Sequence, residues 1–114
     1  MVDCVFCNIA AGELPARMHE TDDAEVVAFD DLQPQAPVHV IVIPRQHIPS
    51  FASLVLDDAE LVSRMVRSIR VIAERLGIQE TGYRVVTNSG PNAGQAVPHL
   101  HFHLLGGAEL GRIA

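Results

Sequence analysis

The sequence predicts an α+β fold in which an antiparallel sheet packs against one long helix. Several short runs rich in β-branched residues are separated by Pro, Gly and Asp, as expected of strands joined by turns. One long segment, residues 57–76, instead repeats its apolar residues at three- and four-residue steps, which is the period of a helix with one buried face. Strands grouped around a single main helix favour an antiparallel sheet.

Two hairpins are expected to build this sheet. Residues 38–43 (VHVIVI) are the clearest strand by composition, and Pro44 ends it. The preceding residues 30–37 contain two Asp and two Pro, which predicts a turn. One hairpin therefore spans residues 25–43 and the other spans residues 83–105. The expected strands are residues 25–29, 38–43, 83–87 and 97–105.

Two helices are expected, a short one at residues 4–11 that ends at Gly12 and the long one at residues 57–76. In the long helix, Asp57 followed by Glu60 resembles a capping box, with Asp as the capping residue. Gly77 stands where a left-handed C-cap belongs. The apolar stripe expected to face the core is Leu61, Val62, Met65, Val66, Ile69, Ile72 and Leu76.

Composition narrows the class of protein. The 114 residues, 48% of them hydrophobic, suffice for one domain, residues 1–114, with a substantial core. The formal net charge of -6 and the absence of a Lys/Arg block disfavour binding to nucleic acid, which needs a basic face. No targeting segment is visible, and the most apolar run is too short to span a bilayer. We therefore expect a cytoplasmic protein with no membrane contact.

Three of the six histidines alternate with apolar residues in the last expected strand. His99, His101 and His103 would share one face, about 6.5–7 Å apart, while the residues between them face the core. Imidazole near neutral pH can be a nucleophile, a general acid or a metal ligand. The strand alone leaves phosphate chemistry and a three-histidine zinc site equally open, with a chance polar face as the structural alternative.

The loop before this strand favours an anionic ligand. Gly90 and Gly94 would let backbone N–H groups approach an anion, and the amides of Asn88 and Gln95 add donors. A flexible hairpin turn would explain the same glycines, so the loop is informative only together with the histidines.

The run HLHFHLL resembles the signature of the histidine triad (HIT) family, and the resemblance covers nearly the whole chain. It is similar to the nucleotide-binding, phosphoramidase-type (HINT-like) branch. The resemblance implies a HIT-like half-barrel antiparallel sheet and a homodimer paired through the long helix and a neighbouring strand. The matching segments are CVFCNIAAGELPA, AFDDLQPQAPVHVIVIPRQHI, GYRVVTNSG and GQAVPHLHFHLLGG.

The resemblance also implies a hydrolase that releases AMP or GMP from purine nucleoside phosphoramidates or related adducts. His101 matches the nucleophile that forms a nucleotidyl-histidine intermediate, His103 matches a phosphate ligand, and no cofactor is needed for the chemistry. His99 and His39 match histidines that support the nucleophile, although His39 also fits an ordinary core histidine. The alternatives are a dinucleoside polyphosphate hydrolase and a nucleotide-binding interaction module with incidental hydrolysis.

The substrate site is carried over in the same way. Asp31 matches the acid that binds the ribose, and it also fits a plain turn residue; Phe6 and Ile9 likewise fit core residues. Ala96 departs from the branch, which often has a serine hydroxyl here, so turnover or leaving-group preference is expected to differ. The residues expected to bind substrate are Asn88, Gly94, Gln95, Ala96 and Val97 around the phosphate, Asp31 at the ribose, and Leu32, Val5, Phe6 and Ile9 around the base.

Cys4 and Cys7 form a C-x-x-C pair, which in an intracellular chain suggests metal or redox chemistry. Two thiolates need two more ligands to complete a zinc site. Resemblance to zinc-binding triad proteins supplies His47 and His99 as the other two. We therefore expect a structural zinc ion at these four residues, with a redox pair and two inert thiols as the alternatives.

Overall fold

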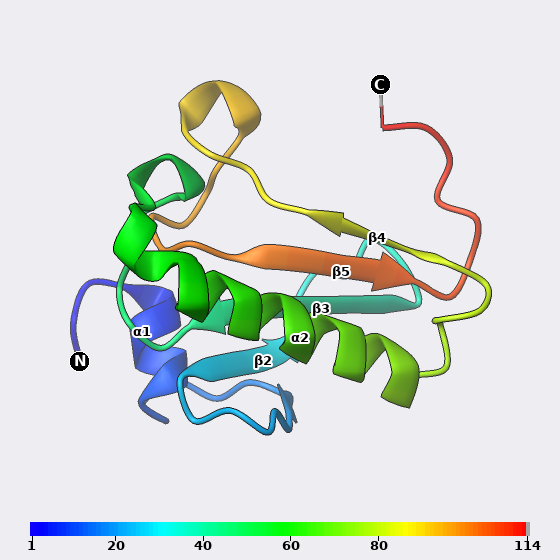
Figure 1. The fold of residues 1–114 in the computed structure, drawn as a ribbon, viewed down its shortest axis with the longest axis horizontal. Coiled ribbons are helices and arrows are strands. Elements are labelled where there is room, and N and C mark those ends of the chain that lie inside the picture. Colours follow the sequence, from blue (N-terminus) through cyan, green and yellow to red (C-terminus); the bar gives the residue numbers. More distant parts are fainter. Residues whose placement is uncertain (114) are drawn as a thin grey trace.

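The computed structural model describes residues 1–113 and contains one open, five-stranded antiparallel sheet (Figure 1). The strands lie in the order β1-β2-β3-β5-β4, so the last strand in sequence is inserted between β3 and β4. The predicted α+β fold, with one long and one short helix, is confirmed. The strands are β1 (Met18–His19), β2 (Val26–Asp30), β3 (Val38–Pro44), β4 (Tyr83–Val86) and β5 (Phe102–Gly106); the helices are α1 (Val5–Ala10) and α2 (Ala59–Arg75).

Both predicted hairpins are present. β2 pairs with β3, and β4 pairs with β5, in antiparallel register. β3 and β5 join the hairpins, and Ile41 on β3 lies opposite His103 on β5. The two-residue strand β1 was not predicted, because Met18 and His19 carry no alternating pattern of their own; it pairs with β2 at the edge of the sheet.

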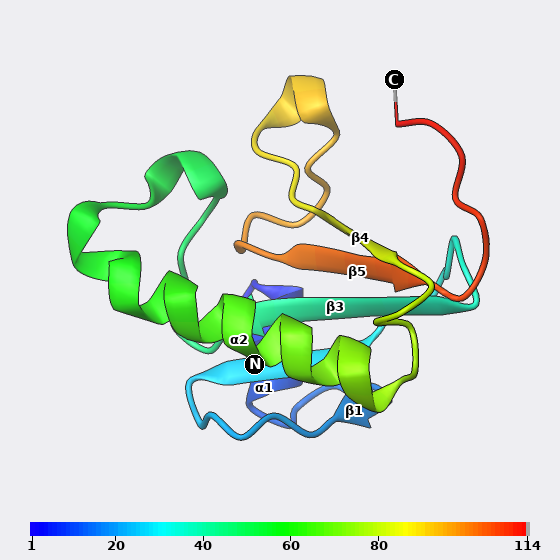
Figure 2. The ribbon, with the colours of Figure 1, turned by 45° about the vertical axis from the view of Figure 1, so that its right-hand side comes forward.

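The helices cover opposite faces of the sheet (Figure 2). On one face, Met65, Ile69 and Ile72 of α2 pack into the main core. The expectation that Val66 faces this core is wrong, because its side chain is exposed at the margin of the helix stripe. On the other face, Phe6 of α1 packs with apolar residues of β2 and β3, including Phe29. None of the helices in the described part of the chain is long and apolar enough to cross a membrane.

The long helix begins later than the predicted residues 57–76. A 3₁₀ turn, Leu56–Asp58, comes first, and α2 starts at Ala59. The predicted capping by Asp57 and Glu60 is wrong, because the Asp58 carboxylate accepts the Val55 N–H at 3.0 Å instead. The prediction for Gly77 is confirmed: it has a φ of 75° and donates its N–H to the carbonyl of Glu74.

The last strand also begins later than the predicted residues 97–105. The N–H of His99 donates to the carbonyl of Val97, and the N–H of Leu100 donates to the carbonyl of Ile48. Residues 97–101 therefore lead into β5 without pairing in the sheet. Leu100, Phe102 and Leu104 nevertheless face the main core, as the alternating pattern predicts. The other predicted boundaries lie within one residue of those observed.

Candidate active site and metal cluster

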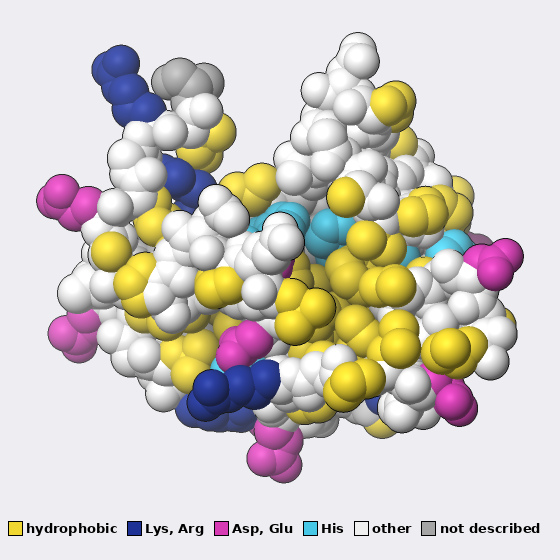
Figure 3. All heavy atoms as spheres, turned by 180° about the vertical axis from the view of Figure 1, so that it is seen from behind, with side chains coloured by type: hydrophobic (Ala, Val, Ile, Leu, Met, Phe, Trp, Pro, Cys, Tyr) yellow, Lys and Arg dark blue, Asp and Glu magenta, His cyan; other side chains and the backbone are white. Residues whose placement is uncertain are grey.

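A cavity of about 250 Å³ opens on the α1 side of the sheet. Figure 3 shows histidine side chains at the bottom of a hollow with hydrophobic side chains around it. Nine of the predicted site residues line this cavity: Val5, Phe6, Ile9, Asp31, Leu32, Ala96, Val97, His101 and His103. The sequence analysis did not name five further lining residues, which are Pro15, Ala16, Phe29, Asp30 and Ile41.

The ring of His101 has a defined tautomer. Its Nδ1 lies 2.7 Å from the backbone carbonyl of His99, and because a carbonyl only accepts, Nδ1 carries the proton. Nε2 then holds a lone pair, and it has no hydrogen-bond partner in the described part of the chain. The ring of Phe6 meets the imidazole edge-on, with centroids 5.0 Å apart. His101 is thus a buried imidazole whose Nε2 is at the cavity.

A relay of hydrogen bonds gives His103 the opposite tautomer to that of His101. The backbone N–H of Gln35 donates to Nδ1 of His39, so His39 carries its proton on Nε2. That Nε2–H donates to Nδ1 of His103 at 2.8 Å. The proton of His103 is therefore on its own Nε2, where it is a donor. His39 consequently contacts His103 and not His101.

Burial keeps both members of this relay neutral. It lowers the pKa of His39 below the ordinary value of 6.5, although the charges of Asp31 and Asp30 oppose the shift. It lowers the pKa of His103 in the same way, and His101 and His39 reinforce the effect. Oδ2 of Asp31 lies 3.4 Å from Nε2 of His39, so the acid at the rim is in contact with the relay.

The loop before β5 is held by Gln95. The side-chain N–H groups of Gln95 donate to the carbonyls of Pro49 and Val97, and its side-chain oxygen accepts the N–H of Gly90. The amide predicted to contact phosphate is therefore occupied within the loop. Asn88 and Gly94 do not line the cavity either. In the described residues the backbone N–H groups of Ala96 and Val97 have no acceptor, which leaves two donors at the cavity wall.

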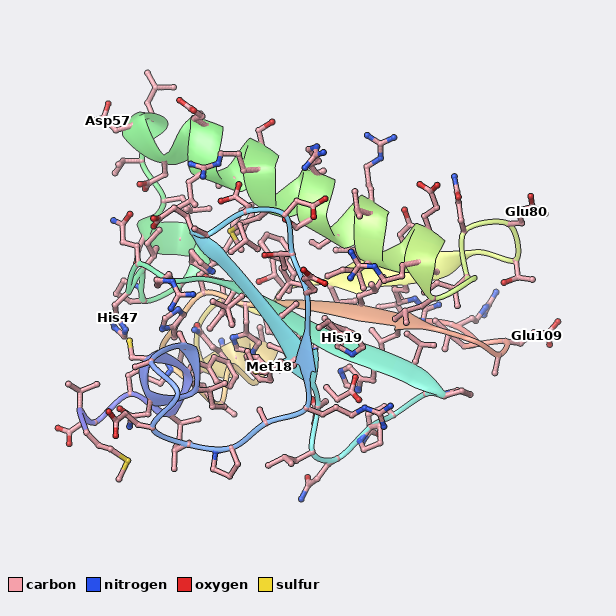
Figure 4. The ribbon with its side chains drawn as sticks, turned by 90° about the horizontal axis from the view of Figure 1, so that it is seen from below. Met18, His19, His47, Asp57, Glu80 and Glu109 are labelled. Atoms are coloured by element: carbon pink, nitrogen blue, oxygen red, sulfur yellow. The ribbon has the colours of Figure 1, made fainter. Side chains whose placement is uncertain are left out.

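The second cluster consists of the four predicted metal ligands. Sγ of Cys4 and of Cys7 lie 3.3 and 3.5 Å from Nδ1 of His99, and Sγ of Cys7 lies 3.4 Å from Nδ1 of His47. All four ligand atoms lie within 4.8 Å of one another, so the group could hold a metal ion. In Figure 4, His47 projects beside the short helix that carries the thiols.

The orientation of His99 suits a metal ligand. Nε2 of His99 donates to the carbonyl of Pro44 at 2.8 Å, which leaves the Nδ1 lone pair facing both sulfur atoms. Burial and the neighbouring Cys4 raise the pKa of the Cys7 thiol, so two thiolates would need a positive charge between them. Tetrahedral zinc places ligand sulfur and nitrogen about 3.5 Å apart, from bonds of about 2.3 and 2.0–2.1 Å.

Sequence reasoning missed the groups that support the histidines. The hydroxyl of Thr87 donates to the carbonyl of His101 at 2.7 Å, just beyond the last paired residue of β4. The carbonyl of Pro44 and the N–H of Gln35 hold the rings of His99 and His39. The sequence offered one indication of the role of Thr87, its position next to Asn88 at the end of a strand. The backbone groups that hold the rings cannot be recognised from residue types.

The chain combines an α+β fold, an antiparallel sheet and a cavity lined by alternating histidines. These features define the class of histidine triad proteins. The chain belongs to the HIT domain family, whose family model matches residues 12–110.

Named relatives and solved structures agree with this membership. The purine nucleoside phosphoramidase of Escherichia coli K12 is 39% identical over 109 residues, which are 96% of this chain and 91% of the relative. The structure of a HIT family hydrolase from Clostridium thermocellum matches with a TM-score of 0.94 at 43% identity, over 100% of this chain and 99% of that one. A histidine triad nucleotide-binding protein from Candida albicans matches with a TM-score of 0.82 at 30% identity, over 98% and 84%.

Proposed function

We propose that the chain is a hydrolase that cleaves purine nucleoside phosphoramidates, or related adducts of AMP and GMP, with His101 as the nucleophile. The observation that carries the proposal is the hydrogen bond from Nδ1 of His101 to the carbonyl of His99. It leaves the Nε2 lone pair free at a cavity that His103 also lines. The 39% identity to a purine nucleoside phosphoramidase supports the choice of substrate.

In the first chemical step, Nε2 of His101 attacks the α-phosphorus and the P–N bond breaks. The bonding pair leaves with the amine nitrogen, which takes a proton from solvent, and a nucleotidyl-histidine remains. In the second step, water attacks the same phosphorus and the P–Nε2 bond breaks. Its electron pair returns to His101, one proton of the water passes to solvent, and the nucleoside monophosphate is released with the oxygen of the water.

Charge on the phosphate oxygens must be offset by donors that are already in place. His103 supplies its Nε2–H, whose direction is fixed by the relay from Gln35 through His39. The free backbone N–H groups of Ala96 and Val97 supply two more. These donors belong to the chain itself, so the proposed chemistry needs no cofactor.

The rest of the cavity suits a nucleoside. Val5, Phe6 and Ile9 of α1 form an apolar wall on which a purine can pack, with Leu32 at the rim. The carboxylate of Asp31 stands at the same rim, where it can accept hydrogen bonds from ribose hydroxyls. Asn88, Gly94 and Gln95, predicted beside the phosphate, act in this proposal by shaping the loop that presents Ala96 and Val97.

A fluorogenic adenosine phosphoramidate tests the proposal. We expect wild-type protein to turn it over and His101→Ala to be reduced by several orders of magnitude, while Thr81→Val, at an exposed residue away from the cavity, stays near wild type. Equal rates for wild type and His101→Ala would overturn the assignment of the nucleophile. Faster hydrolysis of diadenosine polyphosphates would favour that substrate class instead. Tight AMP binding without turnover would favour an interaction module, to which the apolar Ala96 in the cavity lends support.

We also propose that Cys4, Cys7, His47 and His99 hold a structural zinc ion. The support is the ligand set and the spacing of its atoms. When bound, zinc would supply a cross-link between the N-terminal segment and the approach to β5, with no part in phosphorus chemistry. We expect about one zinc per chain in purified protein, and Cys4→Ser/Cys7→Ser to abolish it. Absence of zinc together with two free thiols would rule the site out.

We further propose that two copies pair through α2 and β4. β4 lies at the edge of the sheet, where Val85 of β4 and Val66 of α2 are 43% and 46% exposed. Together with Ile69, Tyr83 and Phe102 they line an apolar hollow, which a second copy would cover in an isologous contact. Sedimentation should give a dimer for wild type and a monomer for Val85→Lys; a wild-type monomer at high concentration contradicts the proposal.

A further inference from the structure

His99 belongs to both clusters at once. Its imidazole Nδ1 faces the two sulfur atoms of the metal cluster, whereas its backbone carbonyl receives the Nδ1–H of His101. The side chain is fully buried, with 0% exposure. A single residue therefore supplies a metal ligand and the acceptor that fixes the tautomer of the nucleophile.

The polar groups of His99 are all engaged, which makes it a rigid connection. Its ring Nε2–H donates to the carbonyl of Pro44, and its backbone N–H donates to the carbonyl of Val97. Because the ring is held between Pro44 and the sulfur atoms, a metal on Nδ1 would add to the contacts that fix the position of residue 99. The carbonyl that orients His101 belongs to the same residue.

Helix α1 provides a second route between the clusters. Cys4 is the N-cap of α1 and its sulfur accepts the N–H of Cys7, so both thiols lie in the first turn. Phe6 lies between them in sequence, and its ring meets the rings of His99 and His101 edge-on at centroid distances of 6.0 and 5.0 Å. Phe6 also lines the cavity. A metal held by the two cysteines would fix the wall on which the base packs.

We infer that metal binding at the Cys4/Cys7/His47/His99 cluster and nucleotide binding at the His101 cavity are thermodynamically coupled, with His99 as a positioning residue for His101. The inference rests on the proposed function for the identity of the nucleotide. Coupling of this kind is reciprocal: the factor by which zinc tightens AMP binding equals the factor by which AMP tightens zinc binding. Couplings between protein sites are typically about 5- to 150-fold, and we expect about tenfold here.

The test measures both sides of this linkage. AMP affinity is determined by calorimetry for zinc-loaded and chelator-stripped protein, and zinc affinity is determined by competition with a chromophoric chelator, with and without AMP. We expect both ratios to be about tenfold and equal. With Co²⁺ in place of zinc, the visible absorption bands should shift when AMP is added. Imidazole ¹⁵N resonances of His101 should report a single Nδ1–H tautomer in loaded protein and a mixture in stripped protein.

Variants at His47 keep the test valid if stripping unfolds the chain. His47 is an exposed ligand that does not line the cavity. His47→Ala should weaken both zinc and AMP binding, and His47→Cys, which restores a fourth ligand, should recover both. AMP affinity that is equal in loaded and stripped folded protein overturns the inference and leaves the proposed function intact. Failure of AMP to bind either form overturns both.

Discussion

Nε2 of His39 lies 2.8 Å from Nδ1 of His103, although the two residues are 64 positions apart in the sequence. This contact links His39 to His103, the proposed phosphate ligand, whereas His101, the proposed nucleophile, is oriented by the carbonyl of His99. The two chemically similar rings are therefore oriented by different partners, one from a side chain and one from the backbone. Each can be disturbed separately.

Replacing His39 tests its role toward His103. His39→Phe keeps a ring but removes the Nε2–H donor, so His103 loses its preferred tautomer. A lost hydrogen bond in a buried site costs about 1–3 kcal/mol, and we expect kcat/KM for an adenosine phosphoramidate to fall about 10- to 100-fold. His39→Gln, whose amide can still donate, should retain more activity than His39→Phe. Identical losses in both variants would show that the donor is unimportant.

Thr87 should affect turnover through the backbone of His101. Thr87→Val keeps the shape of the side chain but removes the hydroxyl that donates to the His101 carbonyl at 2.7 Å. We expect kcat to fall about tenfold, the equivalent of about 1.4 kcal/mol, with a smaller change in KM. Thr87→Ser should retain the bond and most of the activity. Thr81→Val, at an exposed threonine away from the cavity, is the matched control.

Stability should fall on acidification because His39 and His103 are buried as neutral rings. Burial lowers both pKa values below 6.5, so the unfolded chain takes up protons at a higher pH than the folded chain. Their contribution is fully present above pH 6.5 and is lost as the pH falls through the lowered folded values. Urea unfolding between pH 8 and pH 5 measures this. The His39→Gln/His103→Gln variant, which keeps the same metal ligands, should lose less stability than wild type over this interval.

Gly106 is required for close packing at the end of β5. A Cβ at this position would lie 2.8 Å from Cδ1 and 3.2 Å from Cβ of Ile78, which is itself buried. We expect Gly106→Ala to reduce the free energy of unfolding by about 1–3 kcal/mol, as overpacking does. Combining it with Ile78→Ala should cost less than the sum of the single changes, because the second change opens the space. Additive losses in urea unfolding would contradict the packing argument.

The periodic segments of the sequence predicted the fold well. The apolar stripe of α2 has the period of a helix, and the VHVIVI segment has the composition of a buried strand. The strand-like segments and the turns between them predicted both hairpins. The ends of elements were less predictable, since they depend on partners distant in sequence. The Leu100 N–H, for example, leaves the strand pattern because the carbonyl of Ile48 reaches it.

In the candidate site, too, local sequence patterns were informative and contacts between distant residues were not predicted. Side-chain chemistry in the sequence, such as the C-x-x-C pair and the three alternating histidines, indicated which residues would gather. It did not indicate how they would be oriented, because backbone groups set the tautomers of His39, His99 and His101. Gln95 shows the limit most directly: an amide that suits phosphate is bound to three backbone groups of its surroundings.

The position of β5 between β3 and β4 determines when the molecule can assemble during synthesis. β4 has no other partner in the sheet, and one edge of β3 stays open until β5 arrives. The contact between Cys4 and His99 likewise joins residues that are 95 positions apart and cannot form until His99 has been synthesised. Residues 99–106 are synthesised after the other strands and both helices, so sheet, cavity and metal cluster are completed together in one long-range step. Until β5 is made, the chain has an exposed edge on β3 and an incomplete cavity.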